Sequence, residues 1–518
     1  MTKFKKIRML SKIGAISIFS ACISFQSLAS SEQISNAKTV LKDLDQEIEQ
    51  LLSKMDIPSI AVGVVVNGEV VKAKAYGYRD VGKQLKANNK TMYPIASTSK
   101  PFTSFAAGTL VDSGQLSWDL PVSQYISDFK LYNNELTQRV TIKDMLAHRT
   151  GVPRHDYVHA NYANMTRSDL VSRLPFLKPA HLLREKWDYT NIMYAVSGHI
   201  LEEVSGKPFD QLMTENVLKP LGMTDTHLSI ERLKTHENRA VGYWDVDNKL
   251  EVMDYYPMQM GIPAGGIVSN IDDMTLWLKA NLASSGDNQT NKAINESTLK
   301  EIHKPQILIT RAPIDRDYGA TSYTLGWINE RYKGHRILSS RGKIEGFISS
   351  VILYPYDNTG VVVLANKFTS SKVAERIARH IGNRIVLSEN DSGLKRIQER
   401  HIKLKQRAQK RGKTRSEPNE KTLEPEQLKA FTGTYSHPGY GMVKISQKDR
   451  RLILWANGVD TRFMHLEKND FVGLAGAKKT YYQGMKLSFH ESDDGKINAL
   501  SMPLERGLDK PIRFTKNR

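Results

Sequence analysis

Ser97 and Lys100 are the pair of residues whose types and spacing could do chemistry. A serine hydroxyl is barely ionised at neutral pH, so it needs a neighbouring base before it can attack a carbonyl carbon. Residues three positions apart share one face of a helix, which would bring the Lys100 amine to the Ser97 oxygen. Pro101 places the start of that helix at Ser97 or Thr98, because proline is tolerated where the backbone N–H has no partner. Backbone N–H groups in this first turn could stabilise a developing oxyanion.

The residues around Ser97 distinguish it from other serines with the same spacing. An apolar helical stretch follows it from Phe102 to Val111, and burial of that helix would lower the pKa of Lys100, as a base requires. The Ser-x-x-Lys spacing also begins at five serines that lack this context: Ser35, Ser127, Ser297, Ser340 and Ser392.

A second candidate group is Tyr189 with Asn191, just before the apolar helical stretch 192–204. A phenol next to a lysine can act as a general base, and a neighbouring amide can bind substrate. The same Tyr-x-Asn spacing occurs at Tyr162 and Tyr356, and the second of these is predicted to lie in a hairpin turn. We therefore take Tyr189 as the candidate for proton transfer and Asn191 as the candidate for positioning the substrate.

Strand and helix patterns predict the α+β fold that would hold these residues. Residues 60–66 and 70–76 are β-rich runs joined by Asn67-Gly68, a strong hairpin signal. Strand patterns return at residues 347–353 and 361–364, between a largely helical middle section and a closing helix at 373–386, and a one-sided helix is expected at 36–55. The expected architecture is an antiparallel sheet covered by helices, with a helical subdomain.

The chain is predicted to have four segments. Residues 1–29 have a basic start, a short apolar run and small residues at their end, as in a secretory signal peptide. The protein is therefore expected to be exported, to the periplasm or outside the cell, with lipid attachment at Cys22 as an alternative. The remaining segments are the domain with the candidate site at 35–387, a basic helix and linker at 388–424, and a small all-β domain at 425–518.

The charge of the chain limits its partners. Lysine and arginine number 74 against 55 acidic residues, a net charge of +19, and five of the positive charges lie in residues 1–29. Residues 391–415 contain ten lysines and arginines and two acidic residues. That segment is either a solvated linker or a contact for anionic membrane lipid or an envelope polymer. Nucleic acid is not expected as the partner of an exported protein.

No metal or cofactor is expected. The single cysteine, Cys22, excludes an internal disulfide and a cysteine-based zinc site. His148 and His155 have no third ligand at suitable spacing, and His148 is interpreted as a hydrogen-bonding turn residue. Arg154 and Asp156 are interpreted as surface or turn partners without a chemical role.

Together, Ser97-x-x-Lys100 and Tyr189-x-Asn191 resemble the motifs of the serine beta-lactamase and penicillin-binding superfamily. The closest resemblance is to the class C beta-lactamase-like serine hydrolases, which include D-alanyl-D-alanine carboxypeptidases, D-aminopeptidases and esterases. Residues 425–518 resemble the β-rich domain that often follows this catalytic domain. Further stretches in the family's order lie at residues 141–146, 148–151, 220–223, 264–266 and 325–327.

The family's third motif, a lysine or histidine two residues before a glycine, aligns with Ser340-Arg341-Gly342 and differs at its first position. The resemblance implies that Gly342 lets this strand approach closely and that the Lys343 N–H completes an oxyanion hole with that of Ser97. Ser340 offers no charge for a substrate carboxylate, so a preference for neutral esters is expected. Arg341 and Lys343 are the alternatives that could supply the missing charge.

The sequence thus predicts an exported serine hydrolase that forms an acyl-enzyme on an amide or ester substrate. Ser97 would attack the carbonyl, Lys100 and Tyr189 would share the proton transfers, and Asn191 would position the substrate. The alternative is a catalytically silent envelope protein of the same fold, which binds peptidoglycan peptide or a partner through the same cleft.

Overall fold

The computed structural model describes most of the chain. The predicted signal peptide at 1–29, which includes Cys22, lies outside the described residues. Residues 390–392 and 413–422 of the predicted linker also lie outside them, as do the Ser-x-x-Lys serine Ser392 and the Tyr-x-Asn tyrosine Tyr162. Within the described part, no helix is long and apolar enough to cross a membrane. The described residues are 30–160, 165–246, 249–255, 260–283, 293–309, 316–369, 372–389, 393–412, 423–456, 459–474 and 482–517.

A nine-stranded sheet forms the centre of the larger domain, which confirms the predicted α+β class. Its β1 and β13 are neighbours, with Ile60 opposite Ala365, so the early and late strands predicted from the sequence meet in the middle of the sheet. The strands run antiparallel in the order β3 (Leu85–Lys86), β2 (Glu69–Asp80), β1 (Ser59–Val66), β13 (Thr359–Ala365), β12 (Phe347–Tyr354), β11 (His335–Ile344), β10 (Ile328–Tyr332), β9 (Ser322–Tyr323) and β8 (Ile307–Leu308).

Helices cover both faces of this sheet, and the two-residue period of β1 decides which side chains they meet. Val62 and Val64 share one buried cluster with α2 (Leu44–Met55) and α14 (Lys372–Val386). Ala61 and Val65 belong to the cluster of the opposite face, with α12 (Ile271–Leu282). The helix predicted over 36–55 is interrupted at 41–43, where the chain turns before α2 begins.

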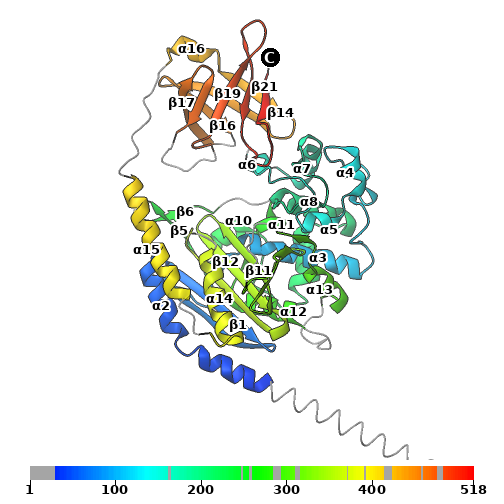
Figure 1. Ribbon diagram of the computed structural model, residues 1–518, viewed down its shortest axis with the longest axis vertical. Helices are drawn as coiled ribbons and strands as arrows, with labels where there is room; N and C mark the ends of the chain where they lie inside the picture. Colours follow the sequence, from blue (N-terminus) through cyan, green and yellow to red (C-terminus); the bar gives the residue numbers. More distant parts are fainter. Residues whose placement is uncertain are drawn as a thin grey trace, which may run out of the picture.

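The middle of the chain forms the predicted helical subdomain beside the sheet (Figure 1). Its longest helices are α3 (Lys100–Asp112) and α8 (Asn191–Ser205), and both are largely buried because apolar residues occur on most of their faces. The shorter ones are α4 (Asn134–Arg139), α5 (Ile142–Leu146), α6 (Tyr157–Ala160), α7 (Arg167–Arg173), α9 (Phe209–Met213), α10 (Ile230–Thr235), α11 (Ile262–Gly265) and α13 (Glu296–His303).

The C-terminal residues form a closed barrel, joined to the larger domain through α15 (Gly393–Gly412) and α16 (Pro425–Lys429). Figure 1 shows the barrel at one end of the molecule, beside α6 and α7. There Arg173 of α7 donates a hydrogen bond to the carbonyl of Gly439. The strands are β14 (Gly433–His437), β15 (Gly441–Lys448), β16 (Arg451–Ala456), β17 (Val459–Glu467), β18 (Asp470–Gly473), β19 (Lys486–Glu491), β20 (Ile497–Met502) and β21 (Ile512–Lys516).

Candidate active site

Ser97 lies in a short 3₁₀ turn, Ala96–Ser99, that leads directly into α3. The Tyr189 hydroxyl donates a hydrogen bond of 2.8 Å to Ser97 Oγ, and Lys100 Nζ lies 3.3 Å from the same oxygen. The structure therefore brings the two sequence motifs together at one hydroxyl. Two groups able to take a proton are in contact with a candidate nucleophile.

The backbone before Ser97 is held in an unfavourable conformation. Ala96 has φ of 48°, in the left-handed region that residues with a side chain rarely adopt. Gly342 of β11 packs against this segment so closely that a Cβ there would lie 2.1 Å from the carbonyl oxygen of Ile95. A side chain at Gly342 would push β11 away from the turn that carries Ser97. β10 pairs with β11 only as far as Ser339, so the edge of the next residues that faces away from β12 is left open beside Ser97.

Lys100 is only 1% exposed, and its amine has defined partners. It donates hydrogen bonds of 2.8 Å to Asn191 Oδ1 and to the carbonyl oxygen of Ala264. Burial lowers the pKa of Lys100, against the opposing influence of Tyr189. A neutral amine has two N–H groups and one lone pair. In the neutral form that a general base requires, these two acceptors would take both N–H groups and the lone pair would face the Ser97 hydroxyl. Asn191 is thus placed to orient Lys100, a role that the sequence argument did not assign to it.

His148 supports the segment that carries Tyr189. It is fully buried, and its Nδ1 accepts a hydrogen bond of 3.2 Å from the Thr190 N–H. Its ring centre lies 4.5 Å from that of Tyr189. Burial holds the pKa of His148 well below its usual value, and the charges of Lys100 and Arg154 add to this effect. His148 is therefore a neutral residue that fixes the backbone between Tyr189 and Asn191, in contact with the site rather than only part of a turn.

Asp144 connects the loop after α5, through Arg149, with the loop before Tyr189, through Arg184. It is fully buried, forms a capping box with Thr141 at the start of α5, and accepts hydrogen bonds from Arg149 and Arg184. Burial raises the pKa of Asp144, but the two guanidinium groups outweigh it and hold the pKa below its ordinary value. The stabilisation from this carboxylate is thus present above the unfolded-state pKa of about 4 and is lost as the pH falls through the folded value.

Replacing Asp144 with asparagine should lower the free energy of unfolding by about 3 kcal/mol at pH 7, because it leaves two arginines without their buried partner. The difference from the wild type should shrink in acid. Urea unfolding at pH 7 and at pH values below 3 measures both, because the contribution is lost only below the unfolded-state pKa of about 4. Asp169→Asn is the matched control, since Asp169 occupies the same position in the exposed capping box of α7 and should change stability far less. Equal effects of the two substitutions would contradict this account of Asp144.

A cavity of about 180 Å³ opens beside Ser97. Ser340 lines it with a short neutral side chain. The position at which this chain differs from the family motif is therefore part of the cavity wall. Arg341 also faces it but forms an ion pair with Glu375 of α14, and the Lys343 amine lies 3.9 Å from the centre of the Phe368 ring. The lining residues are Ser97, Lys100, Trp187, Tyr189, Tyr323, Gly326, Ile328, Ser339, Ser340 and Arg341.

Arg154 and Asp156, interpreted from the sequence as turn residues without a role, contact the site. The Arg154 guanidinium carbon lies 5.1 Å from the centre of the Tyr189 ring, and Asp156 Oδ1 accepts a bond of 3.4 Å from Asn191 Nδ2. Sequence spacing offered no signal for this, because the two residues reach the site through a loop whose path depends on tertiary packing. The hint that the sequence offers is the run Arg154-His155-Asp156, which follows the stretch at 148–151 after two apolar residues.

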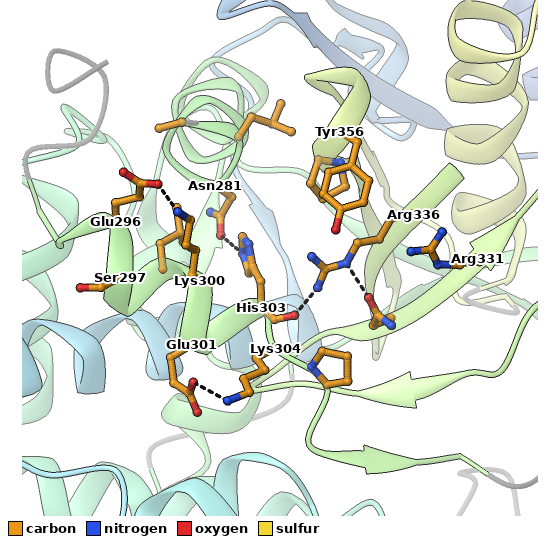
Figure 2. Close-up of a pocket in the computed structure, with 16 residues that line it drawn as sticks. Asn281, Glu296, Ser297, Lys300, Glu301, His303, Lys304, Arg331, Arg336 and Tyr356 are labelled. Atoms are coloured by element: carbon orange, nitrogen blue, oxygen red, sulfur yellow. Dashed lines mark hydrogen bonds and ion pairs between the residues drawn. The ribbon is translucent and has the colours of Figure 1, made fainter. Parts of the chain in front are cut away.

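A larger cavity of about 690 Å³ contains Ser297 and Lys300, another Ser-x-x-Lys pair (Figure 2). There Lys300 forms an ion pair with Glu296 rather than approaching Ser297 (Figure 2). His303 is bonded to Asn281, and Arg336 to the His303 carbonyl. The polar groups of this cavity are thus paired with each other, and among the described residues no base is directed at Ser297.

Comparison with known proteins identifies the larger domain and the barrel separately. The beta-lactamase family model matches residues 44–384, and a model described as a domain of unknown function, DUF3471, matches residues 417–516. A penicillin-binding protein homologue from Pyrococcus abyssi, octameric in its solved structure, has a similar fold with a TM-score of 0.60 and 22% identity, covering 92% of this chain and all of that one. The crystal structure of SurE with D-Leu gives a TM-score of 0.53 at 16% identity, covering 93% of this chain and all of that one. At these identities the two structures establish the fold alone.

Two relatives are similar in sequence as well. Protein flp of Staphylococcus aureus (strain COL) is 30% identical over 350 residues, which cover 67% of this chain and 66% of the relative. The unguisins hydrolase ungD of Aspergillus violaceofuscus is 30% identical over 351 residues, 64% of this chain and 62% of that protein. The chain thus spans just under two thirds of the length of these relatives. On the family match over most of its length, this chain belongs to the beta-lactamase family of serine hydrolases.

Proposed function

We propose that this protein is an exported serine hydrolase that cleaves an amide or ester through an acyl-enzyme on Ser97. The observation that carries the proposal is the pair of contacts at Ser97 Oγ, from the Tyr189 hydroxyl at 2.8 Å and from Lys100 Nζ at 3.3 Å. An unactivated serine would need neither a buried amine nor a phenol at this position.

The reaction has two balanced steps. Ser97 Oγ attacks the substrate carbonyl carbon while its proton passes to Lys100 or Tyr189. The bond to the leaving group then breaks, and that same proton is delivered to the departing nitrogen or oxygen. Water adds to the resulting ester, again giving its proton to the pair, and Ser97 regains a proton as the acid is released. The N–H groups of Ser97 and Lys343 would hold the oxyanion, and Gly342 would allow the approach of the strand.

Covalent labelling and a substrate panel test this proposal. The mature protein should react with a fluorophosphonate probe, and a panel of D-amino-acid peptides, nitrocefin and short-chain nitrophenyl esters should contain at least one substrate. The catalytically silent binding protein is the competing function, supported by Ser340 in place of the family's lysine or histidine. Binding of peptidoglycan peptide without labelling or turnover would favour that alternative.

The proposal that the protein is exported is based on the signal-peptide pattern of residues 1–29. A separate part of the proposal is that the basic segment 391–415 binds an anionic envelope surface. Its described part is α15, which is anchored to the sheet-covering helices through Leu394 and Ile397. In Figure 1, α15 extends from α14 toward the barrel. A helix with one buried edge and many basic residues can present its charge while staying attached to the domain.

Binding of the protein to vesicles that contain anionic lipid should fall steeply between low and physiological salt, because the interaction is electrostatic. Substituting glutamine for Lys403, Lys405, Arg407, Lys410 and Arg411 should remove this binding without changing turnover. Co-sedimentation with vesicles measures the first effect, and ester hydrolysis the second. Undiminished binding by the substituted protein would show that the segment is only a linker.

A further inference from the structure

The loop 151–156, here called the rim loop, contacts Tyr189 directly and Lys100 through Asn191. Arg154 lies over the Tyr189 ring, and Asp156 accepts a hydrogen bond from Asn191, which in turn binds Lys100. Arg154 Nε donates a hydrogen bond of 2.6 Å to Asp156 Oδ2, so the two charged side chains are fixed relative to each other. A guanidinium group is thereby held over the ring of Tyr189, whose hydroxyl is bonded to the nucleophile.

The C-terminal barrel holds the rim loop in place through His155. This residue is fully buried with φ of 44°, and its N–H donates a bond of 2.6 Å to Glu505 Oε2. Its Nε2 lies 3.0 Å from the Lys178 carbonyl, which can only accept, so Nε2 carries the proton. Nδ1 then accepts a bond of 2.6 Å from the Tyr440 hydroxyl. Two barrel residues thus fix the residue between Arg154 and Asp156.

Arg154 differs from the other cations near Ser97 in its exposure and its partners. Its side chain is 46% exposed, and within the described residues its ion pair with Asp156 uses Nε, leaving the two terminal nitrogens for another anion. Lys100 is buried, and Arg341 is paired with Glu375. The neighbouring Glu505 carboxylate is occupied by the N–H groups of His155 and Gly507.

We infer that Arg154 is a specificity-determining residue that binds a carboxylate of the substrate, and that the barrel positions it for this. The inference rests on the proposed serine-hydrolase function. It reverses the preference for neutral esters expected from Ser340, because Arg154 would supply the positive charge that Ser340 lacks. A guanidinium binds a carboxylate through charge-assisted hydrogen bonds, about twice as strong as neutral ones.

The test compares three chromogenic esters on the full-length mature protein. The neutral ester is 4-nitrophenyl butyrate. Mono-4-nitrophenyl succinate carries a carboxylate on the acyl side, and 3-carboxy-4-nitrophenyl butyrate carries one on the leaving group. Only one of the two carboxylate positions can reach Arg154. For the ester that carries its carboxylate there, Arg154→Gln should reduce kcat/KM about tenfold more than for the neutral ester. Arg154→Lys should retain most of that selectivity. Because each variant is compared with the wild type on the same ester, differences in intrinsic reactivity cancel.

Barrel variants test the positioning. Tyr440→Phe removes only the hydroxyl that binds His155 and should cause a smaller selective loss of the same carboxylate ester, about threefold. Tyr435→Phe is the matched control, because its buried hydroxyl donates to the Phe431 carbonyl within the barrel and should leave the selectivity unchanged.

Two results would overturn the inference. One is an equal loss of all three esters in Arg154→Gln, and the other is a selective loss in Arg341→Gln instead. A wild-type protein that is inactive on all three esters and unlabelled by the fluorophosphonate would reject the proposed function itself. A protein that cleaves only the neutral ester would reject the inference about Arg154 and leave the serine-hydrolase proposal intact.

Discussion

Replacing Ser97 with alanine should abolish both covalent labelling and turnover. Ser97 Oγ is the hydroxyl that Tyr189 and Lys100 both contact, and its helix is buried enough to lower the pKa of Lys100. Ser339 and Ser340 also line the cavity, but among the described contacts neither hydroxyl is bonded to Lys100 or Tyr189. The loss should therefore be complete within detection, rather than the partial loss expected for a group that only assists the reaction.

Fluorophosphonate labelling followed by mass spectrometry of the adduct measures this effect, with hydrolysis of a nitrophenyl ester as the second readout. Ser297→Ala is the matched control, because Ser297 has the same spacing to a lysine but that lysine is paired with Glu296. The control should keep full labelling. An adduct on Ser297 or Ser392, or labelling retained in Ser97→Ala, would show that the wrong serine has been chosen.

Replacing Tyr189 with phenylalanine should lower kcat by about 10²–10⁴-fold while the protein stays folded. The substitution removes one hydroxyl, the one that donates to Ser97 Oγ at 2.8 Å, and keeps the ring that packs against His148 and lies under Arg154. Because binding contacts remain, KM should change much less than kcat. Steady-state kinetics on the best ester of the panel, together with circular dichroism, separates the two effects.

Tyr356→Phe serves as its control, since Tyr356 has the same spacing to an asparagine but is 70% exposed near the β12–β13 turn. Its activity should equal that of the wild type. If instead Tyr189→Phe retained full activity, Lys100 alone would be the proton acceptor and the phenol would have a structural role only.

The part of the site that could be predicted from sequence is the part encoded by local spacing. Ser97 and Lys100 are three residues apart at a helix start marked by proline, and Tyr189 and Asn191 lie at the start of α8, the other long buried helix of the subdomain. These relations depend on helix geometry, which is fixed over a few residues. The α+β sheet could be predicted for the same reason, because the strand patterns and the hairpin at Asn67-Gly68 are local.

Arg154, His155 and His148 could not be placed in this way, because their positions depend on contacts between distant parts of the chain. His155 meets Tyr440, which is 285 positions away, and no periodicity encodes such a pair. His148 meets the Thr190 N–H across 42 positions. Closure of the barrel was likewise not evident, since alternation predicts strands but not that β14 pairs with β21.

The pairing of β1 with β13 has a consequence for how the chain acquires its structure. Ser59 and Asn366 are bonded at 2.7 Å although 307 positions separate them. At a synthesis rate of about 5–20 residues per second, the apolar edge of β1 waits roughly 15–60 s for its neighbour to be made. Contacts of such high sequence separation form late and fold slowly. During that interval the hairpin exposes the β1 valines that the finished sheet buries, and apolar surface exposed in this way favours binding by a chaperone.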